Sequence, residues 1–341
     1  MLKKPLFYSL AAILILALIL SGCGGGKSSW ASLDNPAVYA GGYYVNTDGV
    51  DTACYWDAGG RHDLGDGSSN SEVLWLSFYN DHRYAVGYYY NVNEGKMVPC
   101  YWIDGVRQPF VDPAEVGNNA YAACGFVYNG QVYAGGWYND GTNYTPCYWD
   151  EGGRHDLSKG QAGEVHSIFV DGSGVYAAGR NASGQACYWD NQGDRRDVSG
   201  ISGSLATQIV VDANRVYLSG YNGSGARYWV SDGGPVTEHS LNGVEAYSIF
   251  VRNNRVYVGG FYSDGGKEIA CYWDNNGVRY SLANPDSDYA YVNSIFVYNN
   301  KVYAAGDYDN ATEYRACYWD DMGRRHDVDV GASSANCILA R

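Results

Sequence analysis

The chain has 341 residues, a formal net charge of −14 and only 18% charged residues. This acidic balance argues against binding to nucleic acid, whose phosphate backbone attracts Lys and Arg. Aromatic residues make up 15% of the chain, and there are 45 glycines. Such a composition is typical of many short strands joined by tight turns and is unlike that of a disordered chain.

Residues 1–22 have the pattern of a secretory signal peptide. Lys3 and Lys4 precede an apolar run from Leu6 to Leu20, which is short for a membrane span. Leu20-Ser21-Gly22-Cys23 resembles the bacterial lipobox, so we expect lipidation of Cys23. Residues 23–36 would then be the lipidated cysteine and a flexible tether. The alternative is an ordinary signal peptide with an incidental cysteine.

From residue 37 onward a unit is repeated seven times. Its marker is Cys-Tyr-Trp-Asp or a variant, and successive copies begin 40–47 residues apart, at Cys54, Cys100, Cys147, Cys187, Arg227, Cys271 and Cys317. An x-Tyr-x-x-Gly run precedes each marker, an apolar run precedes it in every copy after the first, and most markers are followed by a run of the Arg-His-Asp kind. Asn-Gly and Asn-Asn pairs between the runs suit hairpin turns with positive φ. Each unit therefore predicts four short antiparallel strands.

Seven such units predict an all-β fold, a seven-bladed β-propeller of four-stranded antiparallel blades over residues 37–341. Ala and Gly in the second strand fit the crowded region near the axis, and Tyr-Trp in the third strand fits the wider gap further out. The first repeat starts on a second strand at Val38. The segment from Asn336 to Ala340 has the pattern of a first strand, so we expect it to pair with the first blade and close the ring.

The eight cysteines after Cys23 predict buried thiols. Equivalent cysteines on different blades would lie further apart than the ~7 Å between Cα atoms that a disulfide allows. Neither Cys-x-x-Cys nor His-x-His occurs, so we expect no metal and no other cofactor. Runs such as Arg61-His62-Asp63 recur on the outermost strand. Repetition there favours structural ion pairs and hydrogen bonds, with catalysis as the alternative.

Aromatic residues gather at the bases of the loops between second and third strands. In a propeller these loops share one face with the links between blades, near the mouth of the channel. We predict a ligand-binding face there, formed by Tyr43, Tyr44, Tyr88, Tyr89, Trp137, Tyr138, Tyr221, Phe261 and Tyr262. These side chains could stack on sugar rings or grip a peptide. The alternative is that alternate members pack between blades. Arg180 and Asp307 interrupt the aromatic series, as a specific site would require.

Near-identical blades offer few unlike groups, and no catalytic residue is predicted. An enzyme needs such groups to converge on one centre. The candidates lie just before the first strands and are Glu72, Glu164, His166, Glu245 and Asp288. Two carboxylates within ~5–10 Å at the channel mouth would favour hydrolysis. An aromatic platform without such a pair would favour binding.

The succession of Tyr-Ala-Gly-Gly-Tyr, Ala-Cys-Tyr-Trp-Asp and Arg-His-Asp-Leu resembles bacterial extracellular repeats of the HAF type. Those repeats carry Ala-Phe-Leu-Trp, a turn and Thr-Asp-Leu-Gly. The likeness covers residues 38–341, and the departures are Cys-Tyr-Trp for Phe-Leu-Trp and His-Asp for Thr-Asp. Similar Tyr-Trp repeats occur in secreted bacterial lipoproteins. The resemblance implies a surface-displayed propeller and carries no catalytic residue across.

These features predict a lipid-anchored, extracytoplasmic propeller that acts as a monomeric, non-enzymatic binding or scaffold protein. Its partners would be the membrane, through the N-terminal lipid, and a protein or glycan on the loop face. Gly24 replaces the Asp that often retains lipoproteins in an inner membrane, which favours an outer-membrane or cell-surface location. The alternative function is an enzyme acting on extracellular polysaccharide or peptide at the channel mouth.

Overall fold

The computed structural model describes residues 36–110, 119–157, 161–282, 287–310, 312–329 and 331–341. The predicted signal peptide, Cys23 and most of the tether lie outside these ranges. Within them the chain forms 28 β-strands and no helix. The described residues accordingly contain no helix of the length and apolar character needed to cross a membrane.

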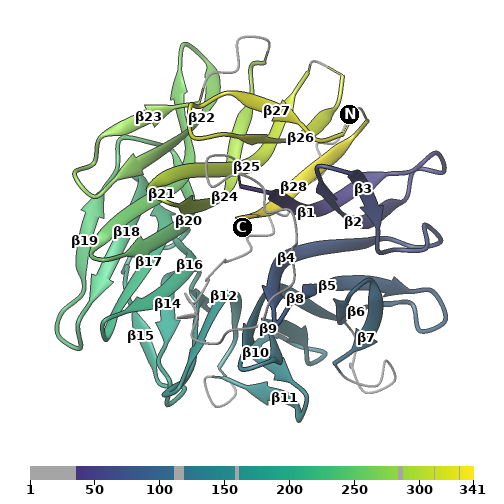
Figure 1. Ribbon diagram of the computed structural model, residues 1–341. Coiled ribbons are helices and arrows are strands. Elements are labelled where there is room, and N and C mark those ends of the chain that lie inside the picture. The colour runs from purple at the N-terminus through teal and green to yellow at the C-terminus, as the bar shows by residue number, and fades with distance from the viewer. Residues whose placement is uncertain (1–35, 111–118, 158–160, 283–286, 311, 330) are drawn as a thin grey trace, which may run out of the picture.

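Seven four-stranded antiparallel sheets stand in a ring around a central axis (Figure 1). This confirms the predicted seven-bladed β-propeller. From the axis outward, blade 1 consists of β28 (Ser333–Ala340), β1 (Val38–Val45), β2 (Asp51–Asp57) and β3 (Gly60–Asp63). In the same direction, blade 2 consists of β4 (Ser71–Tyr79), β5 (His82–Asn91), β6 (Lys96–Ile103) and β7 (Val106–Pro109). Blade 3 consists of β8 (Ala120–Tyr128), β9 (Gln131–Asn139), β10 (Tyr144–Asp150) and β11 (Gly153–Asp156).

The remaining four blades follow in chain order. Blade 4 consists of β12 (Gly163–Asp171), β13 (Gly174–Asn181), β14 (Ala186–Trp189) and β15 (Arg195–Asp197). Blade 5 consists of β16 (Leu205–Asp212), β17 (Arg215–Asn222), β18 (Gly225–Ser231) and β19 (Thr237–Ser240). Blade 6 consists of β20 (Glu245–Arg252), β21 (Arg255–Asp264), β22 (Lys267–Asp274) and β23 (Arg279–Ser281). Blade 7 consists of β24 (Ala290–Tyr298), β25 (Lys301–Asp309), β26 (Tyr314–Trp319) and β27 (Arg325–Asp327).

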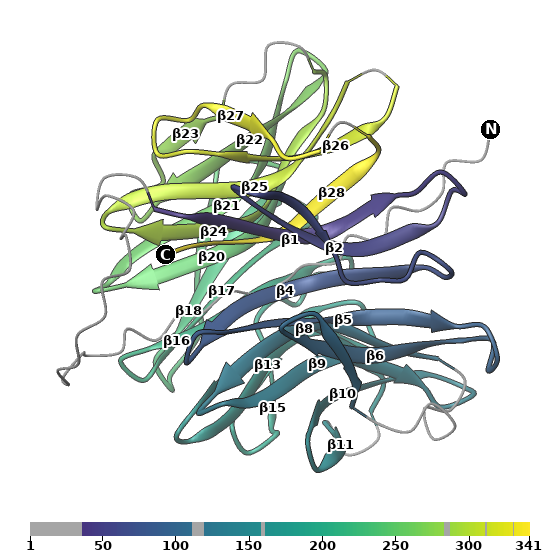
Figure 2. The ribbon, with the colours of Figure 1, turned by 45° about the vertical axis from the view of Figure 1, so that its right-hand side comes forward.

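The two ends of the described chain close the ring. Strand β28 pairs antiparallel with β1, from Val38 opposite Ala340 to Tyr44 opposite Ser333. Figure 2 shows the yellow β28 beside the purple β1. Ala37 and Arg341 extend this pairing with two backbone hydrogen bonds of 3.1 and 3.0 Å. The C-terminal strand is therefore the innermost strand of blade 1, which confirms the predicted closure.

The repeated Cys-Tyr-Trp motif forms the core between blades. The seven motif tryptophans are at most 2% exposed, and the six motif cysteines are fully buried. Trp102 of blade 2 also donates a 3.0 Å hydrogen bond to the carbonyl of Leu64, in the link from blade 1. All eight cysteines in the described ranges are buried free thiols, as predicted. One small thiol and one large indole ring, two residues apart on the third strand, thus help to fill the gap between neighbouring blades.

The recurrent Arg-His-Asp runs build the outer strands. His62 stacks on Tyr55 with ring centroids 4.4 Å apart, and its Nε2 lies 2.8 Å from the carboxylate of Asp57. His155 and His326 repeat this arrangement in blades 3 and 7. Arg61 forms an ion pair with Asp63 at 2.9 Å. These contacts favour the structural interpretation of the runs.

A bulge interrupts every innermost strand at the same register. One extra residue is inserted into each of these strands, namely Leu74, Ala123, His166, Thr207, Tyr247, Asn293 and Asn336. All seven are buried. A bulge bends its strand and redirects the neighbouring side chains. The seven bulges therefore define one level of the propeller, close to the face that carries the inter-blade links.

Candidate functional site: a ring of unlike pairs at the mouth of the propeller

Two residues before each bulged residue, a residue of the innermost strand lies opposite a residue of the second strand. We call these fourteen residues the mouth ring. The pairs are Ser334 with Tyr43, Glu72 with Tyr88, Tyr121 with Trp137, Glu164 with Arg180, Leu205 with Tyr221, Glu245 with Phe261, and Tyr291 with Asp307. The backbone register is the same in all seven blades. The side chains differ from blade to blade.

A polar network joins blades 7, 1 and 2 across the closure. Asn336 donates hydrogen bonds to the carboxylate of Glu72 at 2.8 Å and to the carbonyl of Val73 at 2.9 Å. Ser334 donates to Asp307 at 2.8 Å, and Asn293 donates to the same carboxylate oxygen at 2.6 Å. Side chains of three blades are thus linked at the point where the ring is closed.

Asp307 is buried at the centre of this network. Burial raises the pKa of its carboxyl group from 3.8 to about 6, although the hydrogen bonds from Ser334 and Asn293 act in the opposite direction. Burial likewise raises the pKa of the neighbouring Tyr43, and the negative charges of Glu72 and Asp307 add to this shift. This part of the mouth ring is therefore electronegative.

Aromatic contacts continue the mouth ring from blade 2 to blade 4. Tyr88 donates a hydrogen bond to Glu72 and meets Tyr121 edge-on, with centroids 5.8 Å apart. Tyr121 stacks on Trp137 at 5.5 Å, and Trp137 lies 5.2 Å from the ring of His166. These contacts join three blades through the faces of large side chains.

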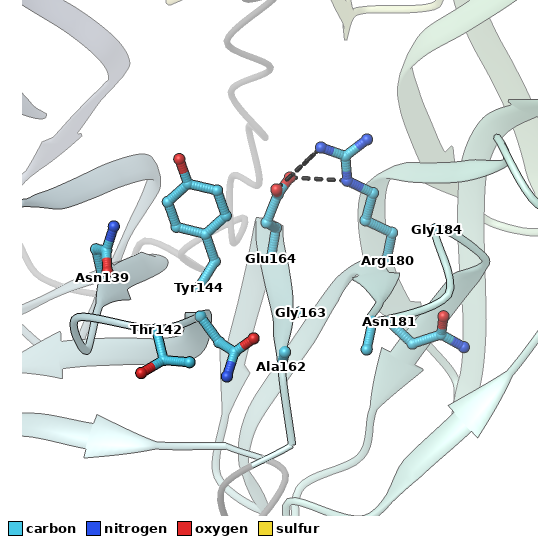
Figure 3. Close-up of a pocket in the computed structure, with 11 residues that line it drawn as sticks. Asn139, Thr142, Tyr144, Ala162, Gly163, Glu164, Arg180, Asn181 and Gly184 are labelled. Atoms are coloured by element: carbon cyan, nitrogen blue, oxygen red, sulfur yellow. Dashed lines mark hydrogen bonds and ion pairs between the residues drawn. The ribbon is translucent and has the colours of Figure 1, made fainter.

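Blade 4 contributes the only cation of the mouth ring, Arg180. Its Nε and Nη2 donate to the two carboxylate oxygens of Glu164 at 2.8 and 2.9 Å, a bidentate pair shown in Figure 3. Nε2 of His166 lies 3.2 Å from the same carboxylate. Burial of Glu164 raises its pKa, but the hydrogen bonds from His166 and Arg180 outweigh this effect and hold the pKa at about 2. Glu164 is consequently ionised at neutral pH.

A cleft of about 480 Å³ opens beside this ion pair, between the loops of blades 3 and 4. Tyr144 and Asn143 line one side, and Arg180 and Asn181 line the other. In Figure 3 the side chains of Tyr144, Glu164 and Arg180 project in the same direction. The volume falls in the range of small-ligand sites.

Blades 5 to 7 complete the mouth ring with a second aromatic group. Phe261 meets Tyr291 edge-on at 5.0 Å and lies 5.8 Å from Tyr247, and Tyr221 packs against this cluster. Tyr247 donates a 2.6 Å hydrogen bond to Glu245. The pKa of Glu245 is raised by burial and by the charge of Glu268, with the Tyr247 hydrogen bond opposing.

The predicted aromatic face is divided into two sets by strand alternation. Five of its members belong to the mouth ring: Tyr43, Tyr88, Trp137, Tyr221 and Phe261. The other four, Tyr44, Tyr89, Tyr138 and Tyr262, point to the opposite face of their sheets. There each lies under an arginine of its own outer strand, at 3.4 to 4.0 Å from ring centroid to guanidinium carbon. The structure thus brings only the first set to the mouth.

Four of the five acid–base candidates also lie at the mouth. Glu72, Glu164 and Glu245 are mouth-ring residues, and His166 is the bulged residue of blade 4. Asp288 lies elsewhere, exposed and paired with Lys267 at 2.8 Å. The sequence reasoning missed several residues of this region: Tyr121, Tyr247, Tyr291, Asn293, Ser334 and Asn336. Each second-strand member of the mouth ring directly follows the glycine of x-Tyr-x-x-Gly, a signal that can be interpreted only once the approach of the two strands at that glycine is known.

The chemistry available at the mouth is that of hydrogen bonding and stacking. Among the described residues no three His, Cys, Asp or Glu side chains come together as a metal site would require. Planar polar groups alternate with aromatic faces around the mouth ring. Such a surface suits a ligand that has both polar and apolar faces.

The fold places the chain in the class of seven-bladed β-propellers, and several solved structures resemble it. TolB from Acinetobacter baumannii has a TM-score of 0.51 and 11% identity over 89% of this chain and 66% of its own. A putative 6-phosphogluconolactonase from Bacteroides uniformis has a TM-score of 0.50 and 10% identity over 90% of this chain and 100% of its own. An acylaminoacyl peptidase from Pyrococcus horikoshii has a TM-score of 0.50 and 13% identity over 87% of this chain and 51% of its own.

These likenesses concern the fold alone, and two of the three proteins are considerably longer than the part that this chain matches. A scan against family models found no match. A search of curated proteins found none either.

Proposed function

We propose that this protein is a lipid-anchored, extracytoplasmic propeller that binds a protein or glycan at its mouth ring and catalyses no reaction. One observation carries the proposal. All seven blades repeat the same glycine and tryptophan and six repeat the cysteine, yet the mouth ring holds a different pair in every blade. A purely structural position in a repeat tends to hold the same residue each time, whereas recognition of a ligand requires unlike groups around one centre.

The position of the chain entry supports this arrangement. Pro36 and Ala37 lie at the start of β1, next to Arg341, whereas Tyr43 lies near the other end of the same strand. A tether attached at Cys23 would therefore join the propeller at the end opposite to the mouth ring. A lipid anchor would leave the mouth free to meet ligands away from the membrane. We also propose that the protein is related to the HAF-type repeat lipoproteins that its sequence resembles. Its proposed location is the outer membrane or the cell surface.

The lipid anchor is tested on Cys23. The full chain is expressed in a bacterium fed an alkyne analogue of palmitate, and the variant Cys23→Ser is compared with it. The wild type should carry the label and sediment with membranes, and the variant should do neither. Label or membrane association that persists in Cys23→Ser would contradict the anchor.

Ligand binding is tested with paired variants of adjacent aromatic residues. The full-length protein is screened against glycans and secreted proteins, and the affinity of each hit is measured again with Trp137→Ala and Tyr138→Ala. Trp137 belongs to the mouth ring, whereas Tyr138 lies under Arg154 on the opposite face of the sheet. Trp137→Ala should weaken binding at least tenfold and Tyr138→Ala should leave it within about twofold. Equal effects of the two variants would contradict a site at the mouth.

A second candidate is hydrolysis of extracellular polysaccharide or peptide. The observation that favours it is the separation of carboxyl pKa values, about 2 for Glu164 and about 6 for Asp307. Such a separation can assign a base and an acid. Against it, Asp307 is only 7% exposed and its carboxylate is held by Asn293 and Ser334. Release of reducing ends or free amines from a substrate panel, abolished by Glu164→Gln, would support the enzyme and contradict the binding proposal.

A further inference from the structure

We propose that the cleft between blades 3 and 4 is a subsite for a neutral oligosaccharide. This inference rests on the proposed binding function and names the ligand class for one part of the mouth. Three observations support it: the charge balance of the cleft, the kind of polar groups that line it, and an exposed aromatic ring at its edge.

The cleft has no net charge although the whole chain is strongly acidic. Glu164 is ionised and Arg180 is a permanent cation, and the two are held together by a bidentate contact. A charged ligand would have to compete with one member of this pair for the other. A neutral ligand can bind to both members without separating them.

The polar groups of the cleft are mostly planar and carry two hydrogen-bonding atoms. Arg180 has five N–H donors, of which Glu164 occupies one on Nε and one on Nη2. Nη1 makes no hydrogen bond within the described ranges and is left for a ligand. Asn143 adds an exposed amide at the opposite wall. Vicinal hydroxyl groups of a sugar are a geometric match for such two-atom groups, because each hydroxyl both donates and accepts. An extended peptide also offers a donor and an acceptor side by side, but these roles are fixed, whereas each sugar hydroxyl can take either role.

Tyr144 supplies an apolar face beside these polar groups. It is 48% exposed, and its side chain projects to the same side as Glu164 and Arg180 (Figure 3). Exposed aromatic rings offer a rigid surface on which the C–H face of a sugar ring can pack. Polar groups on one side and an aromatic face on the other match the two-sided character of a pyranose.

His166, which contacts the cleft residue Glu164, gives a further indication of a built site. Its Nε2 approaches Glu164, while its Nδ1 is buried and makes no hydrogen bond to a described residue. A buried polar atom without a partner is destabilising and is uncommon in native proteins. The imidazole also packs on Trp137, so the Trp137 ring and the Glu164 carboxylate are both held against it.

The test uses the full-length protein and titration calorimetry with defined probes. The neutral probes are tetramers of glucose (malto- and cello-linked), mannose and N-acetylglucosamine. The comparison probes are a galacturonic acid tetramer, which is charged, and an acetylated, amidated tetraglycine, which is a neutral peptide. We expect at least one neutral tetramer to bind, with an affinity that changes less than twofold between 50 and 500 mM salt. Screening would weaken a charged ligand over the same range.

Two variants locate the site. Tyr144→Ala should reduce the affinity for the neutral tetramer about tenfold or more. Tyr90→Ala is the matched control, because Tyr90 is a comparably exposed tyrosine near the end of β5 in blade 2. Tyr90→Ala should leave the affinity within about twofold.

The outcomes separate this inference from the broader function. Binding of a neutral tetramer that Tyr144→Ala does not weaken overturns the subsite. The subsite is equally overturned if only the galacturonic acid tetramer or the peptide binds, or if a protein ligand alone binds at the mouth ring, but these results leave a binding function standing. If the glycan and protein screens both yield no ligand, the binding function and the subsite fail together.

Discussion

A Cβ atom at Gly179 would lie under 3.0 Å from the carbonyl oxygen of Glu164, closer than real Cβ atoms come to another atom. The bulge at His166 lies two residues after Glu164 on the innermost strand. The same clash with a mouth-ring carbonyl recurs in every blade, at Gly42, Gly87, Gly136, Gly220, Gly260 and Gly306. The glycine of x-Tyr-x-x-Gly thus sets the approach of two strands, and the residue after it enters the mouth ring.

Replacing Gly179 should therefore destabilise the propeller. Gly179→Ala forces the second strand away from the carbonyl of Glu164, and overpacking of this kind costs about 1–3 kcal/mol of unfolding free energy or more. Chemical denaturation followed by tryptophan fluorescence measures the change. Gly200→Ala is the control, since a Cβ there would meet no atom within 4 Å, and it should change stability by less than about 0.5 kcal/mol. Equal stability of Gly179→Ala and Gly200→Ala would show that the strands are not held at this distance.

The sequence predicts the architecture well because the strand and turn patterns recur in seven repeats, so each predicted element is supported by several segments of the chain. The Cys-Tyr-Trp markers, the hairpin turns and the first-strand pattern of the C-terminal segment each have a direct structural counterpart. The ring closure followed from order alone, since the repeats begin on a second strand and the last run matches a first strand.

The mouth was predicted only in part, and strand alternation explains the limit. Tyr43 and Tyr44 are adjacent and chemically alike, so the sequence does not show which of them faces the mouth. The bulges add a second difficulty, because one inserted residue changes the side on which the neighbouring side chains lie. Asn293 and Asn336 occupy bulges and were missed for this reason. The space for a Cβ atom at Gly42 shows that the next residue, Tyr43, belongs to the mouth ring. That space depends on the distance between two strands, which no local sequence pattern reports.

Closure by β28 should be essential to the stability of the whole domain. Deletion of residues 335–341 removes the buried Ile338 and Leu339 and exposes the pairing edge of β1. We expect thermal unfolding of the truncated protein at a clearly lower temperature, or no cooperative transition. Deletion of Arg341 alone is the control, because it removes only an exposed ion pair with Asp81, a contact with the ring of Phe78 and the two terminal backbone hydrogen bonds to Ala37. A truncated protein that melts like the full chain would contradict closure as a stabilising device.

The buried thiols should be unreactive until the protein unfolds. Burial raises the pKa of Cys124 and of Cys337 to about 12, so little thiolate forms at neutral pH, and neither sulfur is exposed. With Cys23→Ser as the starting protein, a colorimetric thiol reagent should label none of the eight remaining cysteines in the native state and all eight in guanidinium chloride. Rapid labelling of native protein would show that at least one blade opens readily, which the dense packing between blades does not allow.

Asp307 should make the stability of the propeller depend on pH in a defined direction. Its pKa is about 6 in the folded protein and 3.8 when exposed, so folding favours the protonated carboxyl group. The stabilisation is complete below pH 3.8 and is lost as the pH rises through 6, by roughly 3 kcal/mol for this one group. Asp307→Asn removes the titration while its amide oxygen still accepts hydrogen bonds from Asn293 and Ser334. The unfolding free energy of the variant should therefore rise relative to that of the wild type between pH 4 and pH 7.

The measurement is urea denaturation of both proteins at several pH values in this range. Ser334→Ala supplies an independent check, because it removes a hydrogen bond that favours the charged carboxylate of Asp307. In this variant the pKa of Asp307 should move further upward, and the loss of stability should extend to higher pH. Parallel curves for the wild type and Asp307→Asn from pH 4 to pH 7 would mean that Asp307 folds in its charged form. The hydrogen bonds of the blade 7–blade 1 junction would then outweigh the cost of burying the charge.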